Sequence, residues 1–247
     1  MTVFENQRLN LNGNDNGVVT RHPIALPAAL VEYVKRASTV IESSNRQALS
    51  TSIEDAETVY LPVRGTLLID GGVYEQRPRI LGLLYPGDLV RSSTVPPFDG
   101  TAIIASGSSV TLRLSALKLR QLEQQNPPLA DWVSQASARM QGRLRFHIAS
   151  LSSLSSEKRV LGFLAELGFR LNQNQASTAS FELPVSRMEM ASYLALNADT
   201  LSRIMSKLRS DGLISTSGRN WITLLDFPRL LRLYPFAGSL TELHRLR

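Results

Sequence analysis

The alternation of apolar and polar positions in residues 186–223 predicts two short helices followed by a small hairpin. Ser186 with Glu189 three residues later forms a capping box, which is typical of a helix start. Asn197 can cap a second helix through its side-chain oxygen. Apolar residues at three-and-four spacing predict the buried face of that helix: Leu201, Ile204, Met205 and Leu208. A helix, a tight corner, a second helix and a hairpin in this order indicate a winged helix-turn-helix.

Upstream, the hydrophobic period changes from that of a helix to that of a strand. Short apolar runs separated by Gly, Pro and Asp predict antiparallel strands at 59–63, 66–69, 80–84, 101–105 and 110–114. Several short strands at regular spacing indicate a barrel or a sandwich. A helix is also predicted before them, over residues 27–40, from the spacing of Leu30, Val34 and Ala37.

A long helix is predicted between the strands and the helix-turn-helix. Pro127 and Pro128 suit a first helical turn, and the pattern continues to about residue 150. Its apolar stripe comprises Leu129, Val133, Ala136, Met140, Leu144 and Ile148. This stripe could pack against the chain's own strand domain or pair with a second copy in a coiled coil, which would make the protein a homodimer.

These patterns divide the chain into four parts and indicate an α+β fold. Residues 1–25 are expected to be a flexible arm, 26–125 a β-barrel domain, 126–152 the long helix that would serve dimerisation, and 153–247 the winged helix-turn-helix domain; the resemblance described below implies that the β-barrel domain is effector- or sensor-like. The arm is expected because it is rich in Asn, Gly and Asp without periodicity.

Composition narrows the function classes. A formal charge of +6 and a pI near 10 favour an anionic partner such as double-stranded DNA. The absence of cysteine excludes disulfides and a cysteine-ligated iron–sulfur cluster. No long apolar run or signal pattern is visible, so we expect a cytoplasmic protein without a membrane partner.

No nucleophile grouping, phosphate loop or paired carboxylates suggest an enzyme. His22, His147 and His244 lack metal-ligand spacing, so neither a catalytic residue nor a cofactor is predicted.

Two motifs resemble those of the Crp/Fnr transcription regulators. The run 199–203, Asp-Thr-Leu-Ser-Arg, resembles the Glu-x-x-Ser-Arg of the Fnr and FixK branch, with Asp199 in the Glu position. The run 85–90, Tyr-Pro-Gly-Asp-Leu-Val, resembles a turn of the family's effector domain. The resemblance spans roughly 59–225 and implies a jelly-roll, cyclic-nucleotide-binding-like β-barrel. It also implies a homodimeric regulator, more often an activator, that binds a palindromic TTGAT-like site and recruits RNA polymerase.

The polar face of the second helix supplies the residues expected to read DNA bases: Asp199, Ser202 and Arg203. Arg203 can donate twice to a guanine, or else contact a phosphate, and Asp199 can accept from a cytosine amino group. Contacts to the DNA backbone are expected from Ser186, Arg187, Ser206 and Arg219. Because Asp is shorter than the family's Glu, the base that Asp199 reads stays open.

The sensor domain departs from the cyclic-nucleotide-binding members of the family. Arg91 and Ser92 stand where those members have Gly-Glu, and Asp99 and Gly100 stand where they have an Arg pair. Asp99 would repel a cyclic phosphate, so control by cyclic nucleotide is not expected. A haem- or small-ligand-responsive regulator, with His147 as the candidate haem ligand, remains an alternative. So do a regulator that needs no effector and an interaction module without DNA activity.

Overall fold

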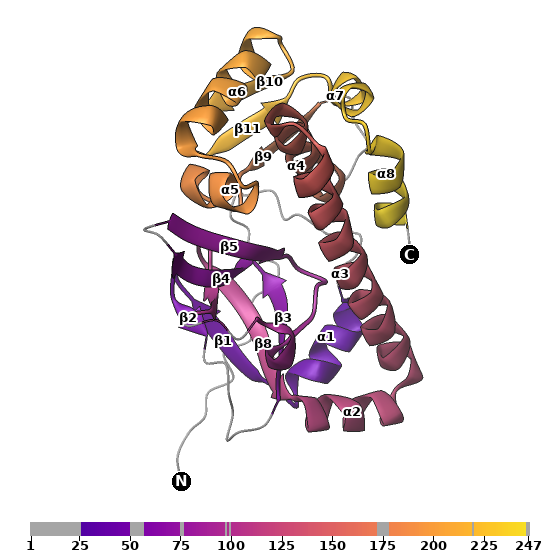
Figure 1. Ribbon diagram of the computed structural model, residues 1–247. Coiled ribbons are helices and arrows are strands. Elements are labelled where there is room, and N and C mark those ends of the chain that lie inside the picture. Colours follow the sequence, from indigo (N-terminus) through magenta and orange to yellow (C-terminus); the bar gives the residue numbers. More distant parts are fainter. Residues whose placement is uncertain are drawn as a thin grey trace.

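The computed structural model describes residues 26–49, 57–74, 77–96, 98, 100–171, 178–218 and 220–245. The predicted arm at 1–25, with His22, lies outside the described residues, as do Asp99 and Arg219. The side chain of His244 is not described either. Figure 1 shows a lower lobe of strands and an upper lobe of helices, joined by one long helix.

The lower lobe consists of two antiparallel sheets with a helix on either side of them in the chain. Its elements are α1 (Ala28–Lys35), β1 (Thr39–Ser43), β2 (Ala48–Leu49), β3 (Thr58–Arg64), β4 (Leu67–Tyr74), β5 (Arg77–Leu84), β6 (Val90–Arg91), η1 (Ser92–Thr94), β7 (Ala102–Ala105), β8 (Ser109–Ser115) and α2 (Ala116–Gln125). The sheet orders are β1-β8-β3-β6 and β2-β7-β4-β5. The sheets are not closed into a barrel, so the lobe is a sandwich of the cyclic-nucleotide-binding-like type.

The predicted first helix is too long. α1 ends at Lys35, and residues 39–43 form β1, whose register pairs Val40 with Leu112. The β-branched pair Val40 and Ile41 favours this extended conformation over a last helical turn.

The long helix α3 (Pro127–Ser153) packs its first half on its own lower lobe. Asn126 caps it, because its Oδ1 accepts a hydrogen bond from the Leu129 amide at 3.1 Å. Leu129, Val133 and Ala136 are buried in one core with side chains of α1, α2, β3 and β8. Placing these three residues in a dimer seam was therefore wrong: the alternative, packing against the chain's own strand domain, holds for them.

The second half of α3 differs from the first. Met140 is partly buried against the core between the two sheets. Leu144 and Ile148 are 53% and 56% exposed. Of the predicted stripe, only these last two residues remain available to a second chain.

A buried ionic cluster, here called the Arg143 network, joins α3 to both lobes. Arg143 places Nη1 2.6 Å from Asp88 Oδ2 and Nε 3.0 Å from Glu166 Oε1. Arg170 Nε lies 3.2 Å from the same Glu166 oxygen. Burial alone would raise the pKa of Asp88, but Arg143, Arg170 and the Tyr85 amide together hold it below its usual value.

The upper lobe contains the helix-turn-helix and a three-stranded sheet. Its elements are α4 (Ser156–Leu171), β9 (Ala179–Glu182), α5 (Arg187–Tyr193), α6 (Ala198–Ser210), β10 (Ile214–Ser217), β11 (Trp221–Leu224), α7 (Phe227–Leu233) and α8 (Ala237–Arg245). β9 pairs with β11, so the predicted two-stranded wing has a third strand. α8 packs beside α3 and α4: Leu240 is buried, and Leu243 reaches Gly142 of α3 (Figure 1).

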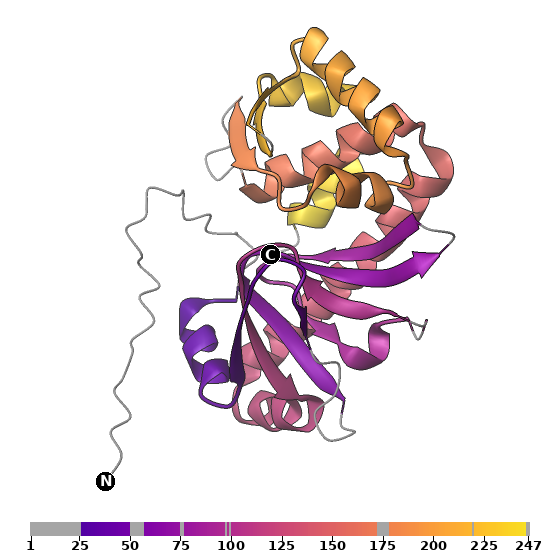
Figure 2. The ribbon, with the colours of Figure 1, turned by 90° about the vertical axis from the view of Figure 1, so that its left-hand side faces the viewer.

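The two lobes share one continuous hydrophobic core. It joins β-sheet residues such as Ile80 and Leu83 to α4, α5 and the upper sheet. Figure 2 shows α5 lying along the β5 edge of the lower lobe. Two polar contacts fix it there: the Ile80 amide donates to Ser192 Oγ at 2.9 Å, and Arg46 Nη1 donates to Glu189 Oε1 at 2.9 Å. Each lobe thus helps to position the helix-turn-helix.

Candidate DNA-binding interface

The two helices of the helix-turn-helix begin where the sequence predicts them. The Ser186 amide donates to Glu189 Oε2 at 2.8 Å, and the Glu189 amide donates to Ser186 Oγ at 3.2 Å, which completes the capping box. The corner between the helices places Ala195 at φ +52°. Asn197 Oδ1 accepts from the Thr200 amide at 2.7 Å and starts α6.

α6 has one buried face and one exposed face. Leu201, Ile204, Met205 and Leu208 are all buried in the core shared by the two lobes. The residues predicted to contact DNA from this helix are all exposed: Asp199, Ser202, Arg203 and Ser206. Within the described part of the chain, the side chains of the first three make no hydrogen bond or ion pair, so their polar groups are free for a ligand.

A groove of about 340 Å³ runs along α6 between the start of α5 and the wing. Its lining includes Arg187, Arg209, Ser206, Thr216 and Gly218. Arg209 donates from Nη2 to Ser206 Oγ at 3.0 Å, so the Ser206 oxygen is already used within the helix. The sequence reasoning missed Arg209; the available signal was its three-residue spacing from Ser206 on the face that continues from the base-reading residues.

The structure shows which donor groups remain at the start of α5 for the predicted phosphate contacts of Ser186 and Arg187. The Ser186 amide is consumed by the capping box, so only the hydroxyl hydrogen of Ser186 remains to donate to a phosphate. Arg187 is half-buried at the mouth of the groove. Arg219 would belong to the wing tip but lies outside the described residues.

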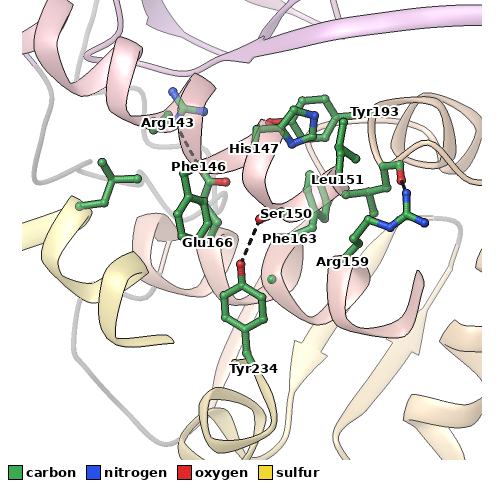
Figure 3. Close-up of a pocket in the computed structure, with 13 residues that line it drawn as sticks. Arg143, Phe146, His147, Ser150, Leu151, Arg159, Phe163, Glu166, Tyr193 and Tyr234 are labelled. Atoms are coloured by element: carbon green, nitrogen blue, oxygen red, sulfur yellow. Dashed lines mark hydrogen bonds and ion pairs between the residues drawn. The ribbon is translucent and has the colours of Figure 1, made fainter. Parts of the chain in front are cut away.

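In the lower lobe, Arg91 and Ser92, which stand where cyclic-nucleotide-binding members have Gly-Glu, contribute to the fold. Ser92 Oγ accepts a hydrogen bond from the Thr58 amide at 3.0 Å, and Arg91 pairs with Glu57 at 3.3 Å. His147 stacks on Tyr193 with ring centroids 4.0 Å apart and planes 6° from parallel (Figure 3). Burial lowers the pKa of His147, so its neutral form is favoured.

Figure 3 also shows the small cavity at the junction of α3, α4 and the end of α5. Its volume is about 30 Å³, and Ser150 and Tyr234 approach each other across it at 3.5 Å. Such a volume suits one or two waters. It is roughly a tenth of what a drug-sized ligand needs, so a haem does not fit there. No group of three potential metal-ligating side chains occurs among the described residues, and none of the helices described is both long and apolar enough to span a bilayer.

The second helix of the capped helix-turn-helix has an exposed polar face beside a wing. Together with the cyclic-nucleotide-binding-like sandwich, this arrangement defines a winged helix-turn-helix regulator. Comparison with known proteins agrees. Residues 158–233 match the Crp-like helix-turn-helix domain. The chain is 23% identical to the nitrogen fixation regulation protein FixK of Bradyrhizobium diazoefficiens over 206 residues, which is 83% of this chain and 86% of that protein.

Two further comparisons extend over most of the chain. The transcriptional regulatory protein btr of Bordetella pertussis is 26% identical over 216 residues, covering 85% of this chain and 88% of btr. The solved structure of FixK2 from Bradyrhizobium japonicum, at 25% identity, superposes with a TM-score of 0.66 over 80% of this chain and 97% of its own. Residues 158–233 therefore carry a Crp-like helix-turn-helix domain, and over most of its length the chain is similar to proteins that are named as transcription regulators.

Proposed function

We propose that two copies of this chain form a dimer that binds a palindromic, TTGAT-like DNA site and regulates transcription there. The observation that carries the proposal is the exposed, unpaired polar face of α6, with Asp199, Ser202 and Arg203 side by side on it. These polar groups have no partner within the described protein, so they contribute little to the stability of the fold. In a major groove, however, each of its groups finds a complementary base edge.

Base recognition is assigned to residues of the first two turns of α6. Arg203 can donate twice to the O6 and N7 of a guanine. Asp199, one turn earlier on the exposed face, can accept from a cytosine amino group. A carboxylate facing the DNA polyanion opposes non-specific binding, so its presence on this face favours sequence discrimination over general affinity.

The dimer seam is assigned to the exposed half of α3. A stripe with heptad spacing remains uncovered or half covered. It shares Leu144 and Ile148 with the predicted stripe but has Ser137 and Gln141 in place of Ala136 and Met140, and it continues to Leu151. Leu144 and Ile148 form its apolar centre, and large exposed aliphatic side chains next to each other on one helix favour a partner. A two-fold seam along α3 also matches the two half-sites of a palindrome.

The experiment that tests the proposal is a binding titration by fluorescence anisotropy. A duplex with the sequence TTGAT-N4-ATCAA is compared with a scrambled duplex of equal length and composition, across a salt series. A preference of about a thousandfold or more for the palindrome is expected of a specific regulator. Equal affinity for the two duplexes would contradict sequence-specific recognition, and transcription in vitro with RNA polymerase on the palindrome would establish activation or repression.

Independence from cyclic nucleotide belongs to the same proposal. Ser92 cannot replace the family's Glu at the ribose, because its hydroxyl oxygen supports the β3 backbone at Thr58. Arg91 is engaged by Glu57. We therefore expect cyclic AMP to leave the DNA titration unchanged, and calorimetry that detected micromolar binding would contradict this part of the proposal.

A further inference from the structure

The groove beside α6 brings together two arginines without a carboxylate to neutralise them. Arg187 begins α5, Arg209 lies in the last turn of α6, and Thr216 and Gly218 of the wing form the opposite wall. None of the described residues that line the groove is acidic. Like charges held close together repel, and an anion placed between them would turn that repulsion into attraction.

Part of the Arg187 guanidinium has no partner. Its Nη1 atom is buried and, among the described residues, no acceptor lies within hydrogen-bond distance of it. Burial, and after it the charge of Arg209, lower the pKa of Arg187 from its usual value. A buried cationic donor without an acceptor is among the costliest of unmatched groups, and because the same guanidinium lines the groove, the negative charge of an anion there would offset part of that cost.

Arg209 is held beside the groove by its own helix. Its Nη2 donates to Ser206 Oγ, and the rest of its fork of donors remains available. Lys207, in the same turn, is in a different situation: its Nζ lies 2.6 Å from Glu157 Oε2 on α4. The two cations are two residues apart, yet one is paired with a carboxylate and the other lines an open groove.

We propose that Arg187 and Arg209 clamp one phosphate group of the DNA backbone between them, with the Thr216 hydroxyl as a further donor from the wing. The inference rests on the proposed function and adds a specific anchor to it. A phosphate offers several acceptor oxygens, which match the forked donors of two guanidinium groups. Because the clamp shares α6 with the base-reading face, holding one phosphate would set the register in which that face meets the bases.

The test uses duplexes in which a single phosphate at a time is replaced by a neutral methylphosphonate. Wild type, Arg209→Gln and Lys207→Gln are titrated against each duplex; the two variants remove the same charge from neighbouring exposed positions. At one phosphate per half-site, neutralisation should weaken the wild type about tenfold and the Arg209→Gln variant no further. Lys207→Gln should keep the wild-type pattern. Arg209→Gln should also reduce the slope of log K against log salt by about 0.9.

Two outcomes would overturn the clamp without touching the proposed function. One is that the fold-loss in affinity caused by Arg209→Gln and the fold-loss caused by neutralising a phosphate multiply at every phosphate. The two changes would then act independently, which would show that Arg209 contacts none of the phosphates. The other comes from titrating inorganic phosphate at constant ionic strength while following the arginine Nε resonances. Saturation below about 1 mM (−4.1 kcal/mol) in wild type but not in Arg209→Gln would assign the groove to a free phosphate ligand. If the wild type bound neither the palindromic nor the scrambled duplex, that result would instead contradict both the proposed function and the clamp.

Discussion

Replacing Ile148 with Asp should separate the dimer without unfolding its subunits. Leu144 and Ile148 are each slightly more than half exposed in the single chain. Full burial of such a side chain contributes about 1.5–3 kcal/mol, so covering the remaining half contributes about 1 kcal/mol each. Four such side chains meet in a dimer, which gives about 4 kcal/mol in total. Ile148→Asp removes half of this and sets two carboxylates against each other, which should raise the dimer Kd at least about a hundredfold.

The assay is sedimentation velocity over a wide range of protein concentrations, with circular dichroism as the measure of folding. Gln124→Asp, on the exposed side of α2, is the matched control and should dimerise as the wild type does. Val133→Asp should behave in the opposite way to Ile148→Asp, because Val133 lies in the core of its own lobe and a buried charge there unfolds that lobe. An Ile148→Asp protein with the wild-type dimer Kd would refute the assignment of the seam.

Four further outcomes are expected. Arg203→Ala should lose about 1–3 kcal/mol on the palindrome but little on a scrambled duplex, so a parallel loss on both would make Arg203 a phosphate contact. Arg143→Met should lower the free energy of unfolding in urea by about 3 kcal/mol, since two carboxylates of the Arg143 network lose their shared guanidinium. Ser186→Ala should cost about 1 kcal/mol in the same assay through the lost cap. Because burial depresses the pKa of His147, the stability that its neutral form contributes should be present above about pH 6.5 and decline as the pH falls below it, with an NMR titration midpoint below that of free histidine.

The helix-turn-helix was predictable because its signals are local. A capping box, an Asn cap and three-and-four spacing are set by residues within one or two turns of each other, and the structure places each of them as the pattern indicates. The strands of the sandwich were predictable for the same reason, except β1, β2 and β6, the last of which is only two residues long and falls at the end of the predicted turn at 85–90. β1 follows directly on a helical pattern, and β2 is only two residues long, so neither has a period of its own.

What the sequence could not provide was the direction in which a helical stripe faces. Leu129 and Ile148 belong to one apolar stripe. Because spacings of three and four residues do not match 3.6 residues per turn, the stripe winds slowly around the helix. Along α3 this rotation carries the first half of the stripe into the chain's own core and the second half out to solvent. The contact partners decide the matter, and besides the neighbouring α2 they come from α1 and β3, which are distant in sequence.

The same limitation explains why the sequence points to Arg187 as a candidate phosphate contact more directly than it points to Arg209. Arg187 follows a capping residue, which is a local signal. Arg209 matters only because the wing folds back and makes a groove with the side of α6, and that closure depends on β10 and β11 pairing in the observed register.

Glu189 shows how contacts between distant parts of the chain also position the start of α5. Its carboxylate caps α5 and also binds Arg46 of the lower lobe, so this residue in the first turn of α5 is held from both lobes at once. Because Arg46 also contacts Asp70 of β4 at 2.9 Å, the position of α5, and with it that of Arg187, depends on the sandwich as well as on the helix-turn-helix itself.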